Sequence, residues 1–209
     1  MIRVVLGDDH PVVRAGLRQI LADAPDVAIV GEAGDGPTVA DRVASTRPDV
    51  VVLDVTMPGS PFVTLLRALR RNHPETAVLA LSVHPEDQYA VRAFRAGAAG
   101  YLSKERSPEL LLEAIRRVAR GGRYVPESLA ERLVARLGAG GEMEAHETLS
   151  DREYEVLCLL GAGRTVGEIA EHLHLSPKTI STFRARILSK MRLHTSAELI
   201  RYAVEHDLT

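Results

Sequence analysis

The chain has 209 residues, a mass of 22.7 kDa and a formal net charge of −2. Hydrophobic residues make up 45% and charged residues 26%, which is typical of a globular protein and excludes a disordered or collagen-like chain. The single Cys excludes an internal disulfide, and the 4% aromatic content argues against a stacking surface for single-stranded nucleic acid. No signal peptide or apolar run of membrane length is present, so we expect a soluble, cytoplasmic protein with no membrane partner.

The first part of the chain alternates strand and helix patterns. Five short apolar runs predict buried strands, and segments with helical spacing follow each of them. The predicted strands are 2–6, 28–30, 50–53, 78–81 and 100–102, and the predicted helices are 11–22, 38–45, 62–71, 88–96 and 108–120. This order predicts an α/β domain over residues 1–120 with a five-stranded, parallel, doubly wound sheet.

The pattern changes after residue 120. Gly121 and Gly122 end the fifth helix, and a short helical patch over 129–137 precedes a Gly-rich, acidic stretch without periodicity. Residues 121–147 are therefore predicted to form a linker with a short helix.

Only helical signals occur from residue 148 to residue 209. Ser150 with Glu153, and Thr165 with Glu168, have the spacing of capping boxes at two helix starts. Ser176 followed by a proline predicts the start of a third, longer helix, and a fourth follows. The spacing predicts an all-α, four-helix domain that contains a helix-turn-helix.

Charged and hydroxyl side chains follow the strands at one edge of the predicted sheet. Asp8 and Asp9 follow the first strand, Asp54 the third, Ser82 the fourth and Lys104 the fifth. Ligands of such folds bind where the carboxyl ends of the strands meet, and close carboxylates with few other ligands suit Mg²⁺. A cation, an ammonium and a hydroxyl around Asp54 would hold a phosphoryl group, with Asp54 as the nucleophile. A single Asp after a strand is more often a turn or capping residue, so the joint pattern carries the prediction.

One helix of the second domain is basic. Between Glu171 and Glu198 the chain has no acidic residue. The basic residues of that interval are Lys178, Arg184, Arg186, Lys190 and Arg192. Such a local concentration of charge is typical of a helix that contacts DNA phosphates, and the short side chains Ser181 and Thr182 are expected near base edges. The alternative is a solvated helix face, but the helix-turn-helix setting favours DNA.

Residues 1–120 resemble the receiver domain of two-component response regulators. The matching stretches begin at Asp8-Asp9-His10-Pro11, Leu53-Asp54-Val55-Thr56, Ala80-Leu81-Ser82 and Gly97-Ala98-Ala99-Gly100-Tyr101-Leu102-Ser103-Lys104. The resemblance implies Asp54 as phosphoacceptor, with Mg²⁺ held by Asp8, Asp9, Asp54 and the main-chain oxygen of Thr56. It also implies Ser82 and Tyr101 as a switch pair, Lys104 as a phosphoryl contact, and a sensor histidine kinase as partner. This chain departs from the family at Ser60-Pro61-Phe62, where Pro61 stiffens the loop.

Residues 149–208 resemble the LuxR-type helix-turn-helix of the NarL/FixJ response regulators. The matching text includes Leu149-Ser150-Asp151-Arg152-Glu153, Leu175-Ser176-Pro177-Lys178-Thr179-Ile180 and Ala197-Glu198-Leu199-Ile200. The resemblance implies a recognition helix over 177–191, a dimerising helix near 197–206, and a homodimer on double-stranded promoter DNA. The expected DNA-contacting residues are Lys178, Thr179, Ser181, Thr182, Arg184, Ala185, Arg186 and Lys190. Many members carry Lys where Ser181 stands, which implies a different operator.

These patterns predict a transcription factor whose dimerisation and DNA binding are controlled by phosphorylation of Asp54, and not an enzyme. An alternative is a haloacid-type phosphatase, but that class needs a second Asp where this chain has Thr56. Another alternative is a DNA-binding protein with an inert receiver, against which the complete acid cluster argues. We expect no metal site built from the histidines, because their spacing does not fit one.

Overall fold

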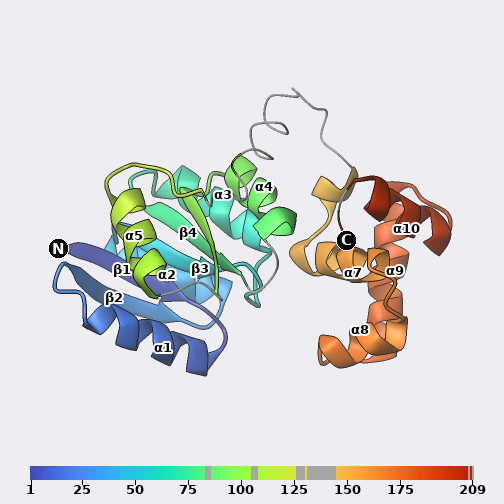
Figure 1. Cartoon of the computed structure of the whole chain (residues 1–209), viewed down its shortest axis with the longest axis horizontal. Helices are drawn as coiled ribbons and strands as arrows, with labels where there is room; N and C mark the ends of the chain where they lie inside the picture. The colour runs from blue at the N-terminus through green and yellow to red at the C-terminus, as the bar shows by residue number, and fades with distance from the viewer. Residues whose placement is uncertain (83–85, 105–107, 126–129, 131–144, 207, 209) are drawn as a thin grey trace. The chain divides into compact units, whose positions relative to one another are not determined.

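The computed structural model describes residues 1–82, 86–104, 108–125, 130, 145–206 and 208. The chain divides into two compact units, Met1–Gly140 and Gly141–Thr209 (Figure 1). This division falls within the segment predicted as a linker. Of the short helix predicted there, only Ala130 lies within the described residues.

The first unit is built on a parallel sheet with the strand order β2-β1-β3-β4-β5. The strands are β1 (Ile2–Gly7), β2 (Val27–Ala33), β3 (Val50–Asp54), β4 (Ala77–Ser82) and β5 (Gly100–Ser103). All four neighbouring pairs are parallel, so every strand ends at the same edge of the sheet. The predicted parallel, doubly wound fold is confirmed, and each predicted strand overlaps the one observed.

Helices cover both faces of this sheet (Figure 1). They are α1 (Pro11–Ala22), α2 (Gly36–Thr46), α3 (Phe62–Asn72), α4 (Glu86–Ala96) and α5 (Pro108–Ala119). On one face, Leu17 of α1 and Ile115 of α5 share a core cluster with Val4, Val52 and Leu81 of the strands. The alternate strand residues are also buried, and α2 and α4 pack on the sheet from the other side. Burial on both faces explains why β3 and β4 are apolar up to their last residues.

The second unit is helical. It contains the 3-10 helix η1 (Ala145–Thr148) and the helices α7 (Asp151–Gly161), α8 (Val166–His172), α9 (Pro177–Met191) and α10 (Ser196–Glu205). The predicted capping boxes at the starts of α7 and α8 are confirmed, with both reciprocal hydrogen bonds present in each. Even α9, the longest helix of the described ranges at 15 residues, is too short to cross a membrane, and no described helix is long and apolar enough to do so.

The loop between β3 and α3 packs tightly on the start of α2. Gly59 has a φ of +88°, and a Cβ at this position would lie 2.8 Å from Cδ of Pro37. Gly36 N donates to the main-chain oxygen of Pro58 at 2.9 Å, which ties the same two segments together. Gly59 is therefore required both by its backbone conformation and by the close approach of Pro37.

We expect Gly59→Ala to destabilise the first unit more than Gly121→Ala does. Gly121 has a φ of +80° with nothing within 4 Å of a Cβ, so its substitution costs only the left-handed conformation, about 1 kcal/mol. At Gly59 the clash with Pro37 adds to that cost. Urea denaturation followed by circular dichroism measures both variants, and equal losses would contradict the assignment.

Candidate functional site

Two buried carboxylates lie side by side at the carboxyl edge of the sheet. Asp8 directly follows β1 and Asp54 ends β3, and these strands pair so that Gly7 is opposite Leu53. Both side chains are only 1% exposed. The strand order therefore places two like charges together in a site from which water is largely excluded.

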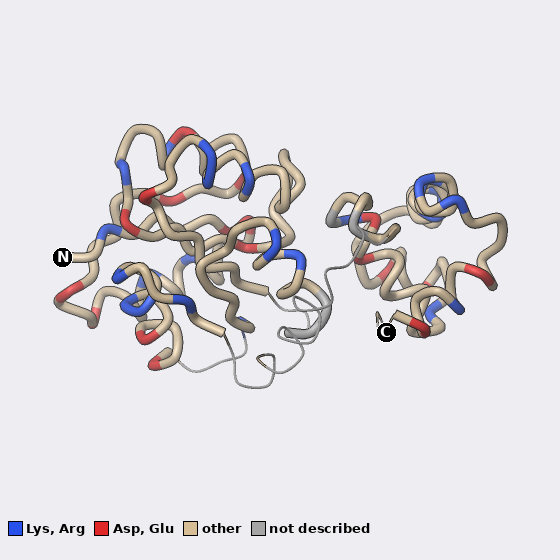
Figure 2. The backbone as a smooth tube through the Cα atoms, turned by 90° about the horizontal axis from the view of Figure 1, so that it is seen from above, with Lys and Arg blue, Asp and Glu red and all other residues tan. Residues whose placement is uncertain are grey.

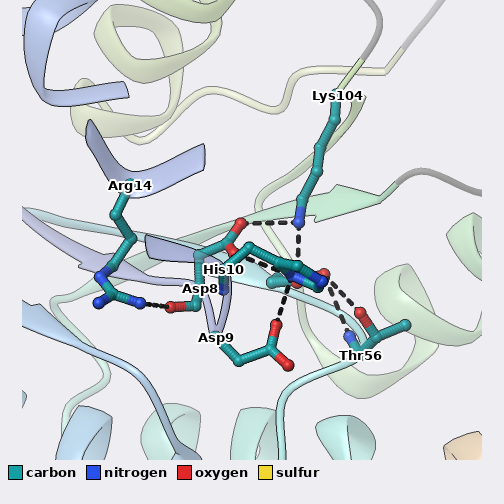
Figure 3. A network of polar contacts seen from close by, with 7 residues as sticks. Asp8, Asp9, His10, Arg14, Thr56 and Lys104 are labelled. Carbon is teal, nitrogen blue, oxygen red and sulfur yellow. Dashed lines mark hydrogen bonds and ion pairs between the residues drawn. The ribbon is translucent and has the colours of Figure 1, made fainter. Parts of the chain in front are cut away.

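Lys104 bridges these two carboxylates. Its Nζ atom lies 2.6 Å from Oδ2 of Asp8 and 2.8 Å from Oδ2 of Asp54, and its side chain is 9% exposed (Figure 3). The main chain fixes this position, because Lys104 N donates to the carbonyl oxygen of Ser82 at 2.7 Å. One ammonium group thus compensates part of the charge of two acids.

The second oxygen of each buried carboxylate accepts hydrogen bonds from the loop that follows its own strand. Oδ1 of Asp54 accepts from the main-chain N and from Oγ1 of Thr56, both at 3.1 Å. Oδ1 of Asp8 accepts from the main-chain N of His10 at 2.8 Å. These contacts fix the orientation of both carboxylate planes. They also occupy the Thr56 hydroxyl at the position where a haloacid-type phosphatase has its second acid.

The pKa values of this cluster reflect burial and mutual attraction. Burial raises the pKa of Asp54 above its ordinary value, and the nearby charge of Asp8 acts in the same direction, against the attraction of Lys104. Burial also opposes the charge of Lys104, but attraction to Asp54 and Asp8 outweighs it and raises the pKa of Lys104. A further positive charge at this site would stabilise the ionised form of Asp54.

Asp9 and His10 complete the cluster on its more exposed side. The Asp9 side chain is 30% exposed, and its Oδ1 lies 2.7 Å from Nδ1 of His10. Ligand atoms of Asp8, Asp9, His10 and Asp54 all lie within 4.8 Å of one another, which is close enough for the group to hold a metal ion after small side-chain movements. The carboxylate donors among them fit a hard divalent cation. His10 was not among the residues predicted for the site, because the spacing of the histidines relative to one another does not reveal a neighbouring carboxylate.

Ser82 and Tyr101 lie on β4, which pairs with β3, and on β5, the edge strand next to β4. Ser82 ends β4, Tyr101 lies in β5, and both are 0% exposed. The main-chain N of Tyr101 donates to the carbonyl oxygen of Tyr124, and the main-chain N of Tyr124 donates to the carbonyl oxygen of Ala99. Residues beyond α5 therefore extend the sheet at the edge of β5. The main chain of Tyr101 is therefore held between β4 and the residues beyond α5.

The basic helix of the second unit is α9. The second unit as a whole carries both acidic and basic residues (Figure 2). The segment without acidic residues, between Glu171 and Glu198, is confined to α9 and its flanks. Five of the expected DNA-contacting residues are exposed: Lys178, Thr182, Ala185, Arg186 and Lys190. The other three are half-buried: Thr179, Ser181 and Arg184. Ile180 and Ile187 are buried on the opposite face, which holds α9 in the core of the unit.

Several of the expected DNA-contacting side chains have partners within the unit. Lys190 Nζ lies 2.6 Å from Oε2 of Glu153, the capping residue of α7. Ser181 Oγ donates to the carbonyl of Pro177, and Thr182 Oγ1 donates to that of Lys178. Burial raises the pKa of Glu153, but hydrogen bonds from Lys190 and Ser150 outweigh it, so the pKa is lowered overall. Lys190 thus joins α9 to α7, a contact that local sequence patterns do not reveal because the two residues are far apart in the chain.

We expect Lys104→Met to destabilise the first unit strongly, because it leaves two buried carboxylates without a counter-charge. The free energy of unfolding should fall by about 3–5 kcal/mol, as for other broken buried ion pairs. Adding Asp54→Asn should recover part of this loss, since it removes one of the two charges. Urea denaturation measures the series, with Arg67→Met, at an exposed position of α3, as the control. A loss no larger than that of the control would contradict this electrostatic description.

Two family models match the two units. The response regulator receiver domain matches residues 4–116, and the luxR family of bacterial regulatory proteins matches residues 147–203. Response regulator UvrY of Escherichia coli K12 is 37% identical over 214 residues, covering 100% of this chain and 96% of UvrY. Response regulator GacA of Pseudomonas protegens is 36% identical, covering 100% of this chain and 98% of GacA.

Solved structures of response regulators are similar to this chain as well. The RcsB response regulator of Salmonella typhimurium superposes with a TM-score of 0.63 at 27% identity, covering 98% of this chain and 100% of that one. An RcsB–DNA complex gives a TM-score of 0.60 at 27% identity, covering 97% of this chain and 98% of that one. The chain therefore belongs to the NarL/FixJ response regulators, DNA-binding transcription regulators with a receiver domain and a LuxR-type helix-turn-helix domain.

Proposed function

We propose that Asp54 is the phosphoacceptor of this response regulator and that its phosphorylation by a sensor histidine kinase controls dimerisation and DNA binding. The observation that carries the proposal is the contact of Lys104 with both Asp8 and Asp54 at the carboxyl edge of the sheet. This arrangement supplies a carboxylate nucleophile and a fixed ammonium group beside it. Phosphoryl transfer depends chiefly on such positioning and charge compensation.

The proposed step is a displacement at phosphorus. An oxygen of the Asp54 carboxylate attacks the phosphorus of a phosphohistidine. The P–O bond forms, the P–N bond breaks, and the leaving imidazole nitrogen takes up a proton from water. Lys104 neutralises part of the charge that the phosphoryl oxygens bring into the buried site. In autodephosphorylation, water adds to phosphorus and the P–O bond to Asp54 breaks, which releases phosphate.

The proposed cofactor is Mg²⁺. The carboxylates of Asp8, Asp9 and Asp54 and the main-chain oxygen of Thr56 would hold it, since these are hard oxygen donors. When bound, the ion supplies positive charge against the phosphoryl oxygens. Three carboxylates with one ammonium leave two negative charges uncompensated, which a divalent cation matches.

The proposed switch links this site to the surface of the receiver domain. Ser82 would donate to a phosphoryl oxygen, and the enclosed Tyr101 would repack in response. A changed surface would then favour a homodimer, whose two helix-turn-helix domains bind two half-sites of a promoter. One solved structure of the relative RcsB contains two RcsB dimers bound to two parallel DNAs, which supports this arrangement.

In the proposed DNA interface, α9 is the recognition helix. The exposed Lys178 and Arg186 are assigned to phosphates, together with Arg184, whereas Lys190 is a weaker candidate because it pairs with Glu153. The first turns of a recognition helix commonly contact base edges. In α9 these turns carry Thr179, Ser181 and Thr182. Ala185 would approach the DNA through apolar contact.

Acetyl phosphate with Mg²⁺ should phosphorylate the full-length chain, and Asp54→Ala should abolish the reaction. Phosphate-affinity electrophoresis detects the product as a shifted band. Asp41→Ala, at an exposed position of α2, is the matched control and should keep the shift. An absent shift in the wild type, or one that persists in Asp54→Ala, would favour an inert receiver.

Arg186→Ala should weaken binding to all DNA sequences and reduce the slope of log affinity against log salt by about one phosphate contact. Ser181→Ala should instead change which sequence is preferred. Fluorescence anisotropy with labelled duplexes at several salt concentrations measures both. Arg67→Ala, at an exposed residue of α3 in the first unit, serves as the control, and a slope unchanged by Arg186→Ala would refute the phosphate assignment.

A further inference from the structure

The acid pocket contains a nitrogen donor besides its carboxylates. Nδ1 of His10 lies 2.7 Å from Oδ1 of Asp9 and 3.5 Å from Oδ1 of Asp8 (Figure 3). These atoms belong to the group of four side chains, completed by Asp54, whose ligand atoms lie within 4.8 Å of one another. Ligands about 2.1 Å from a shared ion lie no more than about 4.2 Å apart, so small side-chain movements suffice to surround one.

Hydrogen bonds fix the main chain that carries the imidazole. His10 is the residue before α1, with Pro11 fixing the first helical position, and its main-chain N donates to Oδ1 of Asp8 at 2.8 Å. Arg14, one turn into α1, donates to the main-chain oxygen of Asp8 from the other side. The turn that carries Asp8, Asp9 and His10 is thus secured at both ends, although the His10 side chain is 64% exposed.

The ligand types of the pocket, carboxylate oxygens and an imidazole nitrogen, determine which metal ions the pocket prefers. Mg²⁺ is a hard ion that takes oxygen ligands and gains little from an imidazole, whereas imidazole suits the borderline divalent ions Zn²⁺, Co²⁺ and Ni²⁺. A site with three carboxylates and one imidazole therefore offers the borderline ions a ligand that Mg²⁺ does not use. The uncompensated negative charge of the pocket does not distinguish the two classes of ion, because both are divalent.

We propose that His10 Nδ1 is a further metal ligand of the phosphorylation pocket and that it raises the affinity of this pocket for divalent transition-metal ions of the Zn²⁺ or Co²⁺ class relative to Mg²⁺. This inference rests on the proposed function, because it uses Asp8, Asp9 and Asp54 as the remaining ligands. A hydrogen bond or ion pair between His10 and Asp9 alone is the competing explanation. Such an exposed pair stabilises the chain by less than about 1 kcal/mol and requires no metal.

The test compares metal affinities of the full-length wild type, His10→Ala and His172→Ala. His172 is an exposed histidine of α8 and controls for adventitious binding to surface imidazoles. Competition with a chromophoric chelator gives the Zn²⁺ affinity, and calorimetric titration gives the Mg²⁺ affinity. We expect the ratio of Zn²⁺ to Mg²⁺ affinity to fall about tenfold or more in His10→Ala and to be unchanged in His172→Ala.

Co²⁺ absorption spectra provide a second measurement that does not depend on phosphorylation. The d–d bands of Co²⁺ bound to the wild type should change in His10→Ala, because a nitrogen ligand is lost. An unchanged affinity ratio, or a Co²⁺ spectrum identical in the two proteins, would overturn the proposal. Phosphorylation of the wild type by acetyl phosphate and Mg²⁺ is measured separately. If it is normal while the ratio of Zn²⁺ to Mg²⁺ affinity is unchanged in His10→Ala, only the role of His10 is refuted. Absent wild-type phosphorylation refutes the proposed function.

Discussion

The structure depends on two carboxylates that the strand order forces together, with one ammonium group between them. Asp8 directly follows β1 and Asp54 ends the neighbouring parallel strand β3, so the backbone places the two carboxylates side by side, and both are buried. Lys104 neutralises one charge and leaves the other. A pocket built in this way is costly to the apo protein and favourable for a cation, which links its stability to its chemistry.

The DNA-binding domain depends on a different type of interaction. Its helices are short, and each start is secured by side chains that accept from main-chain N–H groups, as Ser150, Thr165 and Ser176 do. Glu153 has a double role, because it closes the capping box of α7 and also binds Lys190 of α9. The orientation of the basic helix is therefore tied to the start of α7 by a charged contact in addition to apolar packing.

Much of this could be predicted from the sequence, because the signals are local. The period of the apolar residues indicated the strands and helices, and the topology rules for parallel sheets brought Asp8, Asp54 and Lys104 to one edge. Contacts between residues distant in the chain could not be found in this way, and the Lys190–Glu153 pair is one of them. The place of His10 depends on the backbone angles before α1, which spacing alone does not reveal.

The most direct test of the phosphoacceptor assignment is to map the phosphorylated residue chemically. The full-length chain is treated with acetyl phosphate and Mg²⁺, then reduced with borohydride, which converts an aspartyl phosphate to homoserine, and the peptides are sequenced by mass spectrometry. We expect homoserine at Asp54 and at no other acidic residue. Homoserine at Asp8 or Asp9, or at no position in a chain that has taken up phosphate, would contradict the assignment.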